Sequence, residues 1–337
     1  MKRILYRAKA PDPNTIADIE HLSTLGEVVV HSTLPAYSEY YTNKGYTTVT
    51  DSNFNFNNTE FDYDYGNPPY NGGMYFEFIK DIPNRLAPNG KFCLCLPIYT
   101  AVRKKPRKVF QTQLRLDTID MTVGHKFLGS AEGAWVSVFS GKLGVTNTVK
   151  IVLPNGNILP SVSLSDYMPL SGKAIDQLVR KGISPVVTED FSIADKVMNS
   201  TVPLTKHTKG TLGGHIVYFQ PALRQMSRKR IDTYPGMWAP RGSSKYDTDT
   251  CKDGYYITVD NQQTADSLQS LYCESKIFAY LYTMITSDNM YTNDFIRGLP
   301  DITHMAHKEE TELYKEFDLS ESEVARIEQV VATISRP

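Results

Sequence analysis

Several features that would restrict where the chain works are missing. The sequence has no apolar run long enough to cross a membrane, no signal peptide and no lipidation motif. We therefore expect a cytoplasmic protein with no membrane partner. No internal repeat and no convincing nuclease signature of the PD-(D/E)xK kind are visible, so DNA cleavage is not expected.

Cysteine is scarce, and its spacing does not suit a metal site. The chain has four cysteines, at positions 93, 95, 251 and 273. Cys93 and Cys95 alternate within an apolar, strand-like run, which predicts buried free thiols rather than metal ligands. The sequence gives no reason to expect a bound metal ion.

A net excess of charge is also lacking, but the charges are unevenly placed. The 337 residues carry a formal net charge of −1, are 41% hydrophobic, and have the length of about two domains. Residues 201–246, called the basic window below, contain eight Lys or Arg and a single acid, Asp232. Residues 301–328 hold nine acids and three bases, which explains the near-neutral total.

The first 150 residues alternate between strand-like and helix-like segments. Short apolar runs over 3–7, 27–31, 46–51, 61–66 and 90–97 predict strands, and residues 127–140 are expected to close the sheet. Helical spacing predicts helices over 15–25, with Asn14 as N-cap, over 35–44, ended by Gly45, and over 75–86. Strands that alternate with helices favour an α/β fold with a parallel, doubly wound sheet.

A stiff turn follows the fourth predicted strand. Asn67-Pro68-Pro69-Tyr70 cannot continue a helix, because each proline lacks an N–H and fixes φ. Open α/β sheets bind ligands at the carboxyl ends of their strands. There the Asn67 side-chain oxygen and the Pro68 carbonyl can accept the two hydrogens of an exocyclic amine such as adenine N6, and Tyr70 can offer a ring face to the base. An ordinary Pro-Pro turn is the competing interpretation.

This tetrapeptide, called the target-base turn below, resembles the N-P-P-Y signature of the amino-group DNA methyltransferases. Those enzymes place a methyl group from S-adenosylmethionine on adenine N6. The Pro-Asn-Gly turn at residues 88–90, followed by a strand that ends in proline, is also similar to the family. The resemblance implies that Asn67, Pro68, Pro69 and Tyr70 form the catalytic motif around an adenine flipped out of duplex DNA.

The resemblance also implies a division of the chain. A Rossmann-like methyltransferase sheet is expected over residues 1–150, and a smaller α+β target recognition domain over 151–337. The composition becomes richer in Pro, Gly, Asn and Ser over residues 145–170, which supports a boundary there. Within the second part, the sequence predicts a short helix over 171–181 and an amphipathic helix over 266–286.

The cosubstrate side of the resemblance is incomplete. The family cradles S-adenosylmethionine with a glycine-rich loop after the first strand, but here that loop, Ala8 to Asn14, contains no glycine. His31 stands where an acid would hold the ribose hydroxyls, and we assign it no catalytic role. Only Asp51, after the third strand, matches the acidic position that the family uses near the cosubstrate's adenine.

Two basic segments are candidates for DNA contact. Residues 103–108 carry five cations in six residues, and we expect Pro106 to prevent a helix there. The basic window interleaves cations with aromatic residues and glycines, as nucleic-acid surfaces do, although a merely hydrated face is the alternative. The DNA-binding candidates are Arg103, Lys104, Lys105, Lys206, Lys209, Arg224, Arg228, Lys229, Arg230 and Arg241.

The end of the chain adds a second resemblance. Segments 294–301 and 312–328 are arranged like the ends of adenine methyltransferases from phage and bacterial restriction-modification systems. Ser320 and Glu323 form a capping box that opens a final helix. With the target-base turn, the resemblance covers most of residues 60 to 330.

Three functions remain open from the sequence. The first is a site-specific DNA adenine-N6 methyltransferase that uses S-adenosylmethionine and double-stranded DNA. The second is an inactive or partner-dependent DNA-binding relative that lacks its own cosubstrate site and works with a second protein subunit. The third is an α/β enzyme that acts on free nucleotides, with the basic window binding their phosphates.

Overall fold

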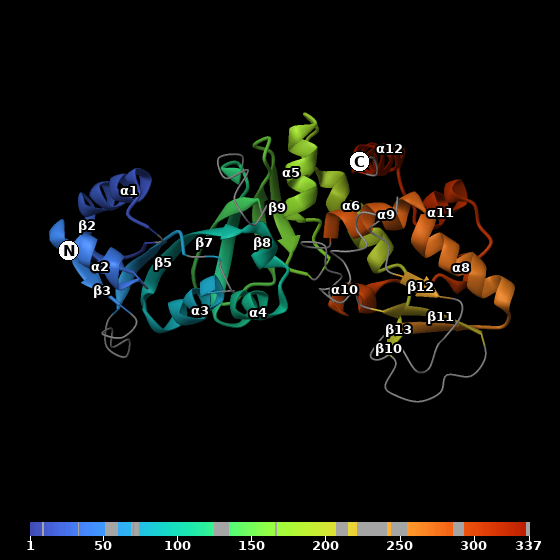
Figure 1. Ribbon diagram of the computed structural model, residues 1–337, viewed down its shortest axis with the longest axis horizontal. Helices are drawn as coiled ribbons and strands as arrows, with labels where there is room; N and C mark the ends of the chain where they lie inside the picture. The colour runs from blue at the N-terminus through green and yellow to red at the C-terminus, as the bar shows by residue number, and fades with distance from the viewer. Residues whose placement is uncertain are drawn as a thin grey trace. The chain divides into compact units, whose positions relative to one another are not determined.

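The computed structural model describes residues 1–8, 10–32, 34–50, 60–68, 70, 74–124, 135–165, 167–206, 215–220, 241–243, 255–285 and 293–334. The chain forms two compact units: unit 1 (Met1–Leu164) and unit 2 (Ser165–Pro337). Both units contain helices and strands (Figure 1).

A large sheet forms the centre of unit 1. Its strands are β1 (Lys2–Arg7), β2 (Gly26–His31), β3 (Thr47–Val49), β4 (Phe61–Gly66), β5 (Leu86–Pro97), β6 (Leu114–Asp120), β7 (Val136–Leu143), β8 (Thr148–Val152) and β9 (Ile158–Ser163). In the described residues their order is β3-β2-β1-β4-β5-β7-β6-β8-β9. Strands β1 to β5 pair in parallel, and β7 runs antiparallel between β5 and β6. The order 3-2-1-4-5 is that of doubly wound Rossmann sheets, so the predicted α/β fold class is confirmed.

Helices cover this sheet from both sides (Figure 1). They are α1 (Pro13–Ser23), α2 (Pro35–Asn43), α3 (Met74–Asp81) and α4 (Lys104–Thr112), with 3₁₀ turns at Ile82–Asn84 and Ile98–Ala101. Ile19 of α1 and Tyr41 of α2 are buried against the apolar side chains of β1 and β2 on one face. On the other face Phe110 of α4 stacks between Phe92 and Phe139.

Two details of unit 1 correct the sequence-based expectations. Asp12, rather than Asn14, caps α1, because Pro13 fits the first helical position and the Asp12 carboxylate accepts from the N–H groups of Asn14 and Thr15. Strand β6 was not predicted. Unit 1 ends at Leu164, within the stretch 145–170 whose composition suggested a boundary; β8 and β9 extend the sheet beyond residue 150, and the Pro, Gly and Asn at 154–157 form the turn between them.

Unit 2 combines helices with a small antiparallel sheet. The helices are α5 (Gly172–Arg180), α6 (Thr188–Met198), α8 (Gln262–Glu274), α9 (Lys276–Ile285), α10 (Asn293–Gly298), α11 (Glu310–Glu316) and α12 (Glu321–Ile334), with a 3₁₀ turn at Thr303–Met305. The strands are β10 (Thr205–Lys206), β11 (His215–Gln220), β12 (Arg241–Ser243) and β13 (Tyr255–Val259), in the order β10-β13-β11-β12 within the described residues. This mixture agrees with the predicted α+β character.

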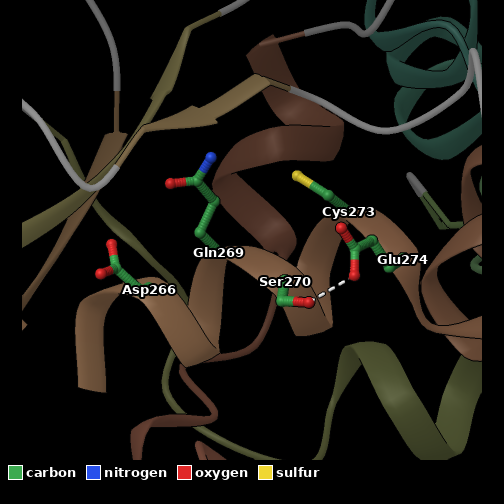
Figure 2. Close-up of a pocket in the computed structure, with 5 residues that line it drawn as sticks. All are labelled: Asp266, Gln269, Ser270, Cys273 and Glu274. Atoms are coloured by element: carbon green, nitrogen blue, oxygen red, sulfur yellow. Dashed lines mark hydrogen bonds between the residues drawn. The ribbon is translucent and has the colours of Figure 1, made fainter. Parts of the chain in front are cut away.

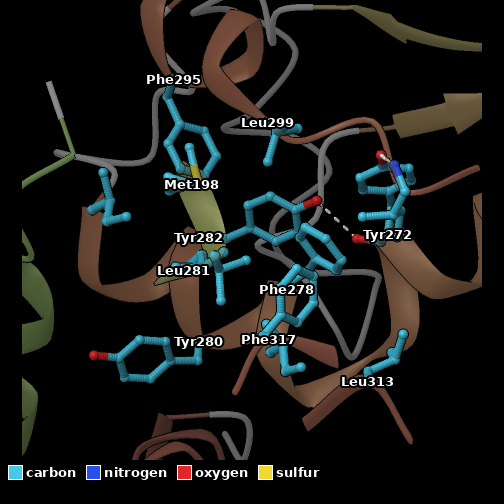
Figure 3. Packing of buried hydrophobic residues seen from close by; sticks show 14 of the residues in the cluster. Met198, Tyr272, Phe278, Tyr280, Leu281, Tyr282, Phe295, Leu299, Leu313 and Phe317 are labelled. Carbon is cyan, nitrogen blue, oxygen red and sulfur yellow. Dashed lines mark hydrogen bonds between the residues drawn. The ribbon is translucent and has the colours of Figure 1, made fainter. Parts of the chain in front are cut away.

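The core of unit 2 is rich in aromatic rings from α8 and α9 (Figure 3). Tyr282 donates a hydrogen bond of 2.8 Å to the Tyr272 carbonyl, and the Tyr272 hydroxyl donates to the Pro300 carbonyl. The predicted single helix over 266–286 is two helices, broken at Ser275. The break is stabilised because Ser275 Oγ accepts from Phe278 N, and Glu310 accepts from the first N–H groups of α9.

Candidate functional site

The target-base turn lies where the strand order of the sheet reverses. Strand β1 has β2 on one side and β4 on the other, so the loops after β1 and β4 leave in opposite directions. This is the switch point at which doubly wound sheets bind ligands. Asn67 directly follows β4, and its N–H donates to the Arg7 carbonyl at 3.2 Å. The first residue of the turn is therefore fixed to the end of β1.

Gly66 allows this close approach. Its φ is +150°, a region that favours glycine. A Cβ at this position would lie 2.4 Å from the Arg7 carbonyl oxygen. A side chain at Gly66 would therefore push β4 away from β1 and displace Asn67.

Tyr70 is turned inward rather than toward solvent. Only 9% of it is exposed, and its ring meets Tyr75 edge-on at 6.5 Å between centroids. Its hydroxyl donates to Asn67 Oδ1 at 2.6 Å and lies 3.1 Å from the Cys95 carbonyl. Asn67 is half-buried and Pro68 is buried, while Pro69 lies outside the described residues. The structure thus brings Asn67, Pro68 and Tyr70 together, but in it the Tyr70 hydroxyl occupies the oxygen that we assigned to the amine.

A buried ionic cluster lies beneath the turn. Arg7 is 1% exposed and makes two hydrogen bonds to Asp64, of 2.7 Å from Nε and 2.5 Å from Nη2. Asp81 lies 3.8 Å from Arg7 and forms an ion pair with Arg85. Burial raises the pKa of Asp81 and, with Arg7 nearby, lowers the pKa of Arg85 to about 10. Because Arg7 and Asp64 are on neighbouring strands, their pair fixes β1 to β4 just before the turn.

A cationic helix, α4, begins close to Tyr75, the residue whose ring meets Tyr70. Residues 104–112 form α4, so the expectation that Pro106 prevents a helix is wrong; a proline in the first turn removes no intrahelical hydrogen bond. Arg103, Lys104 and Lys105 are exposed. Arg107 is buried and donates to the Val102 carbonyl, so one of the five cations of this segment has a structural role.

The described cosubstrate loop does not fit S-adenosylmethionine in the way that the family resemblance implies. Ala8 is buried, and the Asp12 carboxylate already binds the N–H groups at the start of α1, where a ligand's anionic group would be placed. His31 is 2% exposed, and its ring packs edge-on against Phe78 at 5.4 Å, so it does not replace an acid for ribose hydroxyls. Asp51 lies outside the described residues.

Most of the basic window lies outside the described residues. Lys206 lies in strand β10 and Arg241 lies in strand β12. The candidates outside the described residues are Lys209, Arg224, Arg228, Lys229 and Arg230. Contact between these cations and DNA therefore stays a prediction.

The half-buried thiols of unit 1 are unsuited to nucleophilic chemistry. Burial raises the pKa of Cys93 to about 11 and that of Cys95 to about 12, so both stay protonated near neutral pH. Across the described part of the chain, no group of three or more metal-ligand side chains comes together. In those same residues, no helix has the length and hydropathy needed to cross a bilayer.

A separate hollow of about 280 Å³ lies on one face of α8 in unit 2 (Figure 2). Its lining is Asp266, Gln269, Ser270, Cys273 and Glu274. The Ser270 hydroxyl donates to Glu274 at 2.5 Å. These side chains recur at helical spacing on a single element, and we assign no function to the hollow.

Sequence reasoning missed the residues that support the turn. Arg7, Asp64 and Tyr75 read as ordinary strand and helix positions. The charged residues within the strand segments 3–7 and 61–66 were the available signal, since a buried charge needs a partner, but Arg3 and Asp62 in the same segments are charged as well. Their partnership depends on the pairing of β1 with β4, which the sequence alone does not specify.

No protein-family model and no curated protein matches the chain. Among solved structures, similarity is found to a protein described as a predicted O-methyltransferase from Agrobacterium tumefaciens, with 13% identity and a TM-score of 0.34, over 44% of this chain and 77% of that one. A TehB-like SAM-dependent methyltransferase from Corynebacterium glutamicum matches with 13% identity and a TM-score of 0.32, over 42% and 80%. The CcbJ methyltransferase from Streptomyces caelestis matches with 11% identity and a TM-score of 0.23, over 33% and 47%.

Proposed function

We propose that the protein is the target-base-binding chain of a DNA adenine-N6 methyltransferase. In this role it binds an adenine that has left the duplex and presents the N6 amine for methylation. The observation that carries the proposal is the position of Asn67, fixed by the Arg7 carbonyl at the switch point of a doubly wound sheet.

The chemistry of the turn suits an exocyclic amine. An amine with two hydrogens can donate one to Asn67 Oδ1 and one to the Pro68 carbonyl, and both oxygens are acceptors. Two acceptors held on a stiff turn fix the direction of the nitrogen lone pair, which is what attack on a methyl group requires. The Tyr70 hydroxyl can give up Asn67 Oδ1 and donate to the Cys95 carbonyl instead, because both oxygens are within its reach.

The proposed partner is double-stranded DNA. Exposed cations at the start of α4 and the net positive basic window both suit a phosphate backbone. An enzyme that modifies a base must bind the duplex and also extrude the target nucleotide. Unit 2 would supply the recognition contacts, and the turn in unit 1 would bind the extruded base.

The methyl donor would be held by a second protein subunit. The support is the Asp12 cap at the start of α1 and the buried His31, which leave the described cosubstrate loop without the groups that hold S-adenosylmethionine. A second candidate function is methyl transfer by this chain alone. The complete doubly wound sheet favours it, since this architecture normally binds a nucleotide-containing ligand at the same edge.

Nucleoside binding tests the proposal without knowledge of a recognition sequence. We expect deoxyadenosine to bind about tenfold more tightly than the deoxyriboside of purine, which lacks the amine, because the loss of a hydrogen bond leaves a polar group unpaired. Asn67→Ala should remove this preference and leave the affinity for long duplex DNA within about twofold. Titration calorimetry or NMR measures both quantities.

Asn157→Ala is the matched control. Asn157 is an exposed residue in the turn between β8 and β9 of the same unit, and its replacement should change neither affinity. Equal binding of the two nucleosides by the unmodified protein would contradict the proposal, as would an amine preference that persists in Asn67→Ala.

A further inference from the structure

Arg103 combines an exposed position with a fixed guanidinium. Its Nη1 donates to the Tyr75 hydroxyl at 3.1 Å, and its guanidinium lies 4.3 Å from the centre of the Tyr99 ring. Tyr75 and Tyr99 are 2% and 4% exposed, so they are a rigid support. A guanidinium has five N–H donors, and the contact with Tyr75 uses only one of its nitrogens. The remaining N–H donors of Arg103 can therefore bind a ligand in a fixed direction. Because the side chain is already held in place, it loses little conformational entropy when the ligand binds.

The aromatic side chains that hold Arg103 also contact the target-base turn, through Tyr70. The Tyr75 ring meets the Tyr70 ring edge-on at 6.5 Å and the Tyr99 ring at 6.4 Å. Tyr70 in turn hydrogen-bonds Asn67. Arg103 and Asn67 are thus separated by two aromatic side chains, Tyr75 and Tyr70.

The surface around Arg103 carries exposed positive charges and no acid in the first turn of α4, which favours binding of an anion. No carboxylate in the described part of the chain forms an ion pair with Arg103. The adjacent Lys104 and Lys105 are exposed, and the first turn of α4 contains no acid. Cations at a helix N-terminus are disfavoured by the helix dipole, so these side chains do not stabilise α4. An anionic group bound here would relieve that repulsion.

We propose that Arg103 binds the phosphate of the extruded nucleotide whose base is held by Asn67. The inference rests on the proposed base-binding function of the turn and extends it to the backbone of the same nucleotide. Arg103 would position the nucleotide by a forked, charge-assisted contact, which suits phosphate geometry. Tyr75 and Tyr99 would act through Arg103, by fixing the direction of its guanidinium.

Mononucleotides separate the phosphate contact from the base contact. The probes are deoxyadenosine, its 5′- and 3′-monophosphates, and inorganic phosphate, titrated by NMR at low salt. We expect at least one monophosphate to bind about tenfold more tightly than the nucleoside, as a charge-assisted hydrogen bond implies. Arg103→Gln should abolish that difference and leave the affinity for deoxyadenosine within about twofold.

Arg115→Gln is the matched control. Arg115 is an exposed arginine of β6 in the same unit, paired with Asp117, and its replacement removes the same charge. It should preserve the tenfold preference for the monophosphate. Circular dichroism of each variant shows whether the fold is retained.

The possible failures differ in what they overturn. If Arg103→Gln keeps the preference, or if inorganic phosphate competes as well as the monophosphate does, Arg103 is not the ligand of this nucleotide's phosphate. If deoxyadenosine does not bind at millimolar concentration, or binds equally well to Asn67→Ala, the base site itself is wrong and the proposed function fails with it.

Discussion

Asn67 is positioned by its neighbours in space more than by its neighbours in sequence. The two prolines after it make the turn stiff, and this much can be read from the residues alone. Its direction depends on the Arg7 carbonyl and on the Tyr70 hydroxyl. The Arg7 contact needs the pairing of β1 with β4, and the Tyr70 hydroxyl is held in place by β5, so the motif was predictable whereas the contact with Arg7 was not.

Tyr70→Phe tests whether this tyrosine acts through its hydroxyl or through its ring. In the proposed complex the hydroxyl leaves Asn67 Oδ1 to the amine and donates to the Cys95 carbonyl, so its loss should remove the hydrogen bond that then holds the Tyr70 ring against the base. We expect a three- to tenfold loss of deoxyadenosine affinity, roughly 1 kcal/mol, by NMR titration. Tyr37→Phe is the control, because Tyr37 is a half-buried tyrosine of α2 in the same unit. Unchanged affinity in Tyr70→Phe, with loss in Tyr70→Leu, would instead support base stacking.

At the scale of helices and strands, local signals were reliable where capping residues lie close in sequence. The capping box of α12 is confirmed, since Ser320 N donates to Glu323 at 2.6 Å and Glu323 N donates to Ser320 Oγ at 3.3 Å. The break between α8 and α9 was missed because half of it depends on Glu310, far along the chain. Pro106 misled because a proline within the first turn reads like a helix breaker.

Glu323 should make the stability of unit 2 depend on pH. Burial opposes its charge, but hydrogen bonds from Ser192, Lys196 and Ser320 prevail and lower the pKa of Glu323 to about 2. A carboxyl whose pKa falls on folding stabilises the fold above its unfolded pKa and loses that effect as pH falls toward the folded value. We expect the free energy of unfolding to drop by roughly 3 kcal/mol between about pH 4.5 and pH 2 from this group.

Denaturant unfolding, followed by far-ultraviolet circular dichroism at several pH values, measures this effect. Glu323→Gln should be less stable than the unmodified protein at pH 7 and should show a flatter pH dependence in the acidic range. Glu321→Gln, an exposed neighbour on α12, should retain the full slope. Parallel pH curves for Glu323→Gln and the unmodified protein would show that Glu323 is not the responsible group.

At the scale of the whole molecule, the alternation of strands and helices was enough to predict the class of unit 1 but not its limits. The additional strands β8 and β9 lie within a stretch whose composition resembles a linker, and only the pairing of β8 with β6 and of β9 with β8 shows that they belong to the sheet. The two-part organisation of the chain was readable from its length and from the Pro-, Gly-, Asn- and Ser-rich composition of residues 145–170. The recognition role of unit 2 remains a prediction.

A titration with S-adenosylmethionine distinguishes the two functions proposed for the whole chain. Because Asp12 caps α1 and His31 is buried, we expect no measurable heat of binding from the chain alone at cosubstrate concentrations up to about 1 mM. A dissociation constant of 1 mM corresponds to a binding free energy of about 4 kcal/mol, so any affinity of the chain for the cosubstrate should be weaker than this. Deoxyadenosine binding by the same sample is the positive control. Micromolar binding of S-adenosylmethionine would favour methyl transfer by this chain alone.

Gly66 has a consequence for how the protein tolerates change. Its left-handed φ and the Arg7 carbonyl oxygen, 2.4 Å from any added Cβ, exclude every other amino acid unless two strands separate. A saturation screen that selects for folded, nucleoside-binding variants should therefore recover glycine alone at this position. In contrast, the glycine at 156, which has open space around it, should accept asparagine, a residue that tolerates positive φ.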